Sequence, residues 1–284
     1  MAYQNIGSPP LIYLNIPEYL ASTGKITIDP VFRTLPVSAS PITEIPDINS
    51  LITLNTLPII AILGHSANVI TVGGISSYVD RVNGTLDNVM AGFSIFSTNT
   101  YNIDSIEFDN GNAGSILICA PYEFPHSPDL NLSISYEYDG IKETTTKGGA
   151  TLTNQFYNKP PKWGDLGAWE LGGEPEYAKS GRRVWSLSFS YLSDSSIFPP
   201  TSALVNNETS VYESANTSNN TLLVYQSLQR CIHLCNGGQI PFLFQPDGDV
   251  KENYAIAKFD MKSFSFQQTA PNLYSVKMKI REVW

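Results

Sequence analysis

A strict alternation of apolar and polar residues constrains the fold of this chain more than any other feature. Between residues 184 and 192, a Trp, a Leu, a Phe and a Tyr alternate with three serines. Successive side chains of a β-strand point to opposite faces, so this pattern predicts a strand with one buried face, on which all four apolar residues lie. The pattern recurs in residues 132–138 and 274–281. The sequence therefore predicts a mainly β protein.

Other segments add strands of a different kind. The continuous apolar run at residues 57–63 predicts a strand that is buried on both faces. The turn sequence Asp-Asn-Gly-Asn at 109–112 predicts a β-hairpin that joins residues 105–108 to residues 115–120. We expect these strands to form β-sandwich or jelly-roll domains.

One α-helix is predicted, at residues 221–236. Its apolar residues recur near helical spacing, Asn219 or Asn220 can cap its start, and Gly237 with Gly238 can end it.

The N-terminal segment, residues 1–40, carries five prolines. Proline disfavours both helix interiors and central strands, so we predict an extended arm. The arm also contains apolar residues such as Leu14 and Ile16. It should therefore pack on its own domain or on a neighbouring subunit.

Charge is scarce and unevenly spread over the 284 residues. Only 15% of them are charged, against about 25% in average domains. Residues 1–140 hold 13 acidic and three basic residues, whereas residues 141–284 hold 13 acidic and 14 basic ones. This asymmetry predicts two units with different surfaces. An acidic chain without a basic face argues against nucleic-acid binding.

Targeting and redox signals are few. No run approaches 18 consecutive apolar residues, so no membrane-spanning helix is predicted. Residues 1–10 lack the basic and apolar regions of a signal peptide. The three cysteines are too few for a disulfide framework, which favours reduced thiols in a protein assembled inside a cell.

Residues with catalytic or metal-binding chemistry do not form a recognisable motif. Cys231 and Cys235 lie four residues apart on one predicted helical face, but a zinc site needs further ligands. His65 follows the buried run without an accompanying nucleophile motif. We therefore expect packed thiols and a structural histidine.

The acidic residues do not form a recognisable motif either. The following could supply calcium ligands but lack the spaced loop motif: Asp80, Asp87, Asp104, Asp109 and Asp129. Three further carboxylates, Glu170, Glu174 and Glu176, could serve a glycosidase, but a Gly- and Pro-rich loop leaves their separation undetermined. The sequence predicts no catalytic, cofactor or metal residue, and hence a protein that is not an enzyme.

A long loop at residues 150–180 carries Trp163, Trp169 and Tyr177. Such rings either stack on sugars or anchor a subunit interface, where Trp and Tyr are enriched. We favour the interface. The candidate interface residues are Trp163, Trp169, Tyr177, Leu14, Ile16 and Trp284.

Three stretches resemble tail structural proteins of tailed bacteriophages: residues 181–192 (GRRVWSLSFSYL), 259–266 (FDMKSFSF) and 279–284 (KIREVW). Residues 59–67 (IIAILGHSA) resemble the start of a galactose-binding-like jelly roll found in phage virion proteins. The resemblance implies a jelly roll at 45–139, inserted into an assembly domain made of residues 1–40 and 141–284.

The resemblance also implies a function. We expect a virion structural protein, a tail adaptor, distal-tail or baseplate ring subunit, assembled in the host cytoplasm. Its partners would be copies of itself, in a ring of six, and neighbouring tail proteins. One alternative is a carbohydrate-binding module for host recognition, with the jelly roll as binder. A third is a polysaccharide-cleaving tail enzyme. No cofactor is expected.

Overall fold

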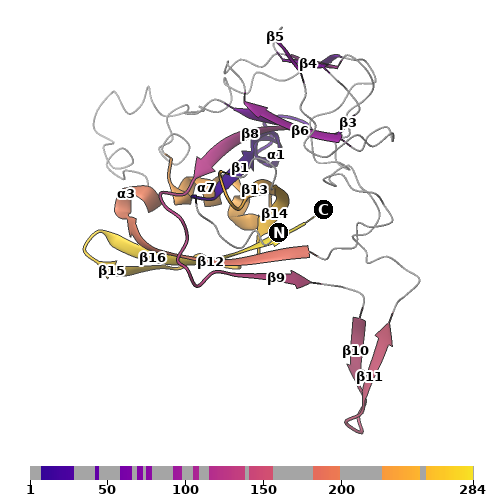
Figure 1. The fold of residues 1–284 in the computed structure, drawn as a ribbon, viewed down its shortest axis with the longest axis vertical. Coiled ribbons are helices and arrows are strands. Elements are labelled where there is room, and N and C mark those ends of the chain that lie inside the picture. The colour runs from indigo at the N-terminus through magenta and orange to yellow at the C-terminus, as the bar shows by residue number, and fades with distance from the viewer. Residues whose placement is uncertain are drawn as a thin grey trace.

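The protein is mainly β, with a large antiparallel sheet and few helices (Figure 1). The predicted class is therefore confirmed. The computed structural model describes these residues: 8–28, 42–44, 58–65, 69–72, 75–78, 92–97, 105–108, 115–137, 141–155, 182–198, 226–249 and 254–283.

Ten antiparallel strands form the main sheet. In spatial order they are β6 (Gly92–Ser97), β3 (Ile59–His65), β8 (Ser115–Glu123), β1 (Leu11–Asn15), β13 (Phe242–Gln245), β14 (Ala255–Phe259), β16 (Leu273–Glu282), β12 (Arg182–Ser193) and β9 (Ser133–Glu137), with β15 (Phe266–Ala270) also paired to β16.

Two smaller sheets accompany it. One contains β2 (Ile42–Glu44), β7 (Ser105–Phe108), β4 (Val69–Val72) and β5 (Ile75–Tyr78) in that order, and the other is the hairpin of β10 (Ile141–Thr145) and β11 (Thr151–Gln155). The helices that the structure describes are α1 (Ile16–Ser22), α3 (Asp194–Ile197), α7 (Leu228–Leu234) and the 3-10 turn η1 (Asn236–Gly238).

The main core joins both ends of the large sheet. It contains Ile62 of β3 and Ile118 of β8 together with Trp185 of β12, and the helices add Leu20 and Leu228. A second cluster packs on the opposite face of the central strands and includes Tyr13, Leu117 and Leu243. Strands β3, β8, β1 and β13 therefore bury side chains on both faces, which confirms the double burial predicted for the apolar run at 57–63 over its described part.

The N-terminal segment is the main correction to the predicted elements. Residues 11–22 form a central strand and a helix rather than an extended arm, since β1 pairs with both β8 and β13. Pro10 precedes the strand, and Pro17 lies in the first turn of α1, where no backbone N–H is required. Asn15 caps that helix by accepting from the Glu18 N–H at 3.4 Å. The prolines thus mark element boundaries.

The predicted helix at 221–236 is shorter. Helix α7 begins at Leu228, because Ser227 is extended and its side chain accepts from the Arg230 N–H. Residues 219–225 lie outside the described residues. The predicted glycine stop is wrong by position: α7 ends at Leu234, and Asn236, which follows the Cys235 cap, already has φ +48°. Gly237 and Gly238 come after it in η1, where both have positive φ, which glycine adopts without strain. Helices α1 and α3 were not predicted.

Two local predictions about strands were wrong. The turn at 109–112 does not make a hairpin, because β7 pairs with β2 and β4 whereas β8 pairs with β1 and β3. In β12 the alternation ends at Tyr191, which is 74% exposed with φ +62°, because the register shifts between Phe189 and Leu192. Pairing between distant strands prevails over both local signals.

Strands from both sides of residue 140 share the main sheet. β3, β6, β8 and β9 come from the segment predicted as an inserted jelly roll, and β12 to β16 come from the predicted assembly domain. Only the four-stranded sheet lies wholly within residues 42–108. The division of the chain into those domains stays a prediction.

Candidate functional site

The polar face of β12 and β16 is the candidate site. Antiparallel register places Ser186 opposite Lys279 and Ser188 opposite Lys277, and directly opposed residues of paired strands share a face. On the other face of this strand pair, Leu187 and Phe189 of β12 and Val276 and Met278 of β16 are buried. One side of this strand pair therefore forms the core, and the other presents hydroxyl and ammonium groups.

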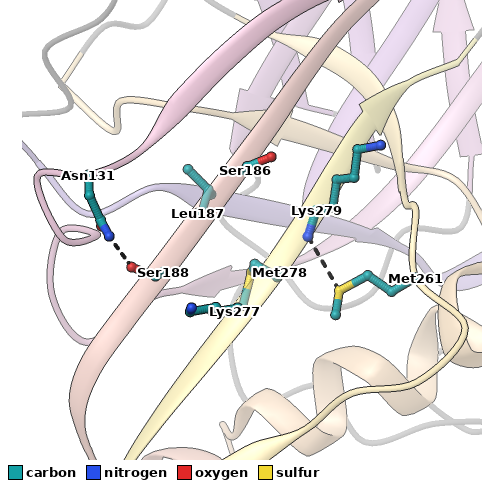
Figure 2. Close-up of a pocket in the computed structure, with 8 residues that line it drawn as sticks. All are labelled: Asn131, Ser186, Leu187, Ser188, Met261, Lys277, Met278 and Lys279. Carbon is teal, nitrogen blue, oxygen red and sulfur yellow. Dashed lines mark hydrogen bonds between the residues drawn. The ribbon is translucent and has the colours of Figure 1, made fainter.

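A shallow, open depression lies on this strand pair, with a volume of about 360 Å³. Figure 2 shows the residues that line it, which are Asn131, Ser186, Leu187, Ser188, Met261, Lys277, Met278 and Lys279. Asn131 comes from the loop before β9 and Met261 from the segment after β14. Four segments of the chain thus meet at one place.

Charge pairing along β16 is uneven. Lys279 Nζ lies 3.0 Å from Asp260 Oδ2, and Arg281 forms an ion pair with Glu137 and lies 3.7 Å from the same Asp260 oxygen. Lys277 has no carboxylate partner among the residues that the structure describes. Within the described part of the chain, Lys277 is therefore the basic side chain of the depression that forms no ion pair.

Asp129 fixes the wall that contains Asn131. Its carboxylate accepts from the hydroxyls of Ser188 at 2.7 Å and Ser190 at 2.9 Å, and from the Ser190 N–H at 3.3 Å. Burial by itself would raise the pKa of Asp129. The hydrogen bonds lower this pKa by more than burial raises it, so that it lies below the usual value. The Asn131 side-chain oxygen lies 3.0 Å from Ser188 Oγ.

Replacing Asp129 with Asn should destabilise the fold at neutral pH by about 1 kcal/mol at most. Because the folded pKa is depressed, the stability that the carboxylate supplies is present above the unfolded pKa and is lost as pH falls through the folded pKa. The deficit of Asp129→Asn should therefore shrink below about pH 4. Urea unfolding at neutral and acid pH measures this stability deficit. An equal deficit at both pH values would contradict the lowered pKa of Asp129.

The β10–β11 hairpin is the second unusual surface. Among the strands that the structure describes, its two strands pair with each other and with no third one, and Figure 1 shows the hairpin extending away from the main sheet. Residues 144–152 are all exposed, and Leu152 is 59% exposed. Its turn is closed by Thr146, whose hydroxyl donates to the Ala150 carbonyl and accepts from the Ala150 N–H, each at 3.1 Å.

The predicted interface residues divide into two groups. Leu14 and Ile16 are fully buried in the chain's own core, so the structure corrects their role: they stabilise the chain itself and offer no surface to a partner. The four aromatic candidates lie outside the described residues, and their role stays a prediction. They are Trp163, Trp169, Tyr177 and Trp284.

The cysteines are buried and reduced, as expected. Burial raises the pKa of the Cys119 and Cys235 thiols, which makes both poor nucleophiles.

His233 lies on the exposed side of α7, where its Nε2 is 3.0 Å from the Tyr19 hydroxyl. Burial lowers the pKa of His233. The hydrogen bond between the Tyr19 and His233 side chains therefore links α1 to α7.

The other chemical candidates are spread out. His65 lies on β3, and Asp129 is the one calcium candidate inside the described residues, where it binds serines. The remaining aspartates and Glu170, Glu174 and Glu176 fall outside them.

Sequence reasoning missed the depression, although its signal was present. The alternation in residues 184–192 places serines on the polar side of one strand. The alternation in residues 274–281 places lysines on the polar side of another. Pairing the two segments antiparallel would have brought Ser188 and Lys277 together. Asn131 and Met261 could not have been found, because they follow from loop geometry.

No family model matches the chain, and no curated protein matches it either. Within the described ranges, none of the helices has the length and apolar character needed to span a membrane.

Proposed function

We propose that the chain is a structural subunit of a bacteriophage virion, an adaptor, distal-tail or baseplate ring protein that acts through protein–protein contacts rather than catalysis. The observation that carries this proposal is the β10–β11 hairpin. An isolated two-stranded hairpin is at best marginally stable in water. A hairpin that extends from the body gains stability when another surface covers it.

Composition supports the same proposal. A low proportion of charged residues suits a chain that buries much of its surface in an assembly. Heterologous contacts between identical subunits generate closed rings, and the number six comes from the phage resemblance. The neighbouring tail proteins would be the other partners, and the virion tail would be the final location after assembly in the host cytoplasm.

Replacing Leu152 with Glu should weaken self-association by about tenfold or more, because it places a charge in the contact that the hairpin makes. Thermal unfolding of the dissociated chain should change little, since the side chain is already exposed. The measurement is the mass distribution of the full chain by analytical ultracentrifugation over a concentration series.

Leu130→Glu is the matched control. Leu130 is 99% exposed but lies on the body, next to Asp129, rather than on the hairpin. It should leave the mass distribution unchanged. A wild-type chain that stays monomeric up to hundreds of micromolar would refute the structural proposal. Equal effects of the two variants would refute the role of the hairpin.

A further inference from the structure

We infer that the depression between β12 and β16 binds an acidic sugar, a monosaccharide unit that carries a carboxylate, through Lys277 and the hydroxyl and amide groups beside it. The inference is independent of self-association. It also differs from the carbohydrate-binding alternative raised above, which placed the binder in residues 45–139, because the floor of this site belongs to the C-terminal strands.

The cation is the first part of the argument. Three basic side chains follow one face of β16, and two of them, Lys279 and Arg281, are neutralised by carboxylates of this chain. In Figure 2 the side chain of Lys277 leaves β16 on the side of Ser188, whereas that of Lys279 runs away from β12. Lys277 is therefore placed to pair with a carboxylate that the described part of the chain does not supply.

Hydrogen-bonding groups form the second part. Ser186 is exposed opposite Lys279, and Ser188 is held in place by Asp129 and faces Asn131. The Ser186 hydroxyl and the Asn131 amide can donate to and accept from sugar hydroxyls, whereas the Ser188 hydroxyl, whose hydrogen goes to Asp129, can accept from them. Because Asp129 fixes Ser188 before a ligand arrives, little side-chain entropy is lost there on binding.

Met261 supplies an apolar wall. Its sulfur accepts from the Lys279 backbone N–H at 3.3 Å, which restrains an otherwise flexible side chain. The C–H face of a sugar ring can pack on such a thioether. The volume of about 360 Å³ is at the small end of ligand pockets, which fits one or two sugar units.

A simple inorganic anion fits this site less well. Sites for phosphate or sulfate usually converge several backbone N–H groups or arginine forks on the ion. Here one ammonium group is available, and the remaining polar groups suit a ligand that carries hydroxyls as well as a charge.

Methionine-methyl NMR of the full chain provides a local test, because the sequence has four methionines. The probes are sodium glucuronate, glucose and sodium sulfate at matched ionic strength. We expect glucuronate to shift the Met261 methyl signal saturably, with a dissociation constant in the millimolar range. Glucose and sulfate should each shift Met261 at least severalfold less.

Lys277→Ala should weaken glucuronate binding about fivefold, as expected for one exposed ion pair. Lys147→Ala is the matched control, since Lys147 is an exposed lysine in the hairpin turn, and it should bind like the wild type. The proposal fails if Met261 does not respond to glucuronate, if sulfate acts equally well, or if Lys277→Ala binds as tightly as the control.

Discussion

Replacing Trp185 with Ala should lower the free energy of unfolding by about 3–5 kcal/mol. The indole is 1% exposed and meets Phe244 of β13 edge-on, with ring centroids 5.1 Å apart. Strands β12 and β13 are separated in the sheet by β14 and β16, so this contact crosses the interior of the fold. The guanidinium of Arg183 lies 5.1 Å from the same ring. Truncation would leave a cavity that rigid sheet neighbours cannot fill.

Urea unfolding at neutral pH measures the loss for Trp185→Ala. The matched control is Ser186→Ala, one residue along the same strand but on its exposed face, which should change stability by less than about 0.5 kcal/mol. A loss below about 1 kcal/mol in Trp185→Ala would mean that the indole does not join the two ends of the core.

Replacing Glu282 with Gln should lower the free energy of unfolding by about 2–3 kcal/mol, because it breaks a largely buried ion pair. The Glu282 side chain is 8% exposed, and its Oε1 accepts from Arg183 Nη2 at 2.8 Å. Its Oε2 accepts from Arg183 Nε at 3.0 Å and from the Arg183 backbone N–H at 2.8 Å. An amide would retain one acceptor but would present a donor to the guanidinium, whose charge would remain.

A double variant separates the ion pair from simple packing. Arg183→Met combined with Glu282→Leu should recover part of the stability lost in Glu282→Gln, since no unpaired charge is left. Asp260→Asn is the control for exposed charge: its side chain is 34% exposed, and the change should cost less than about 1 kcal/mol. If Glu282→Gln and Asp260→Asn lower the free energy of unfolding equally, burial does not strengthen the ion pair between Arg183 and Glu282.

Periodicity in the sequence predicted which faces are buried but not which strands are neighbours. The alternation around Trp185 defined the inner face of β12 up to Phe189. It could not show that the strand at Leu11–Asn15 lies at the centre of the sheet, because pairing partners are set by contacts between distant segments. Proline content was misleading for the same reason, since its effect depends on whether it falls inside an element or at its end.

The candidate sites likewise combine side-chain faces, which the sequence predicts, with neighbouring segments, which it does not. The serines and lysines of the depression lie on strands that the sequence identified, so their faces were predictable once the register was known. The ion pairs that occupy Lys279 and leave Lys277 available depend on Asp260, which lies between β14 and β15 and has no periodicity of its own. The separation of β10 and β11 from the other described strands could not be predicted either, because a sequence pattern does not show which strands stay outside the main sheet.

The position of β1 has a consequence for how the chain reaches its final state. Residues 11–15 pair with residues 119–123 on one side and with residues 242–245 on the other. During synthesis this apolar segment leaves the ribosome before either partner, and its second partner emerges more than two hundred residues later. The main sheet therefore cannot close until residues 242–245 have emerged. Folding dominated by such long-range pairing is slow, and the waiting strand is open to association with other chains in the meantime.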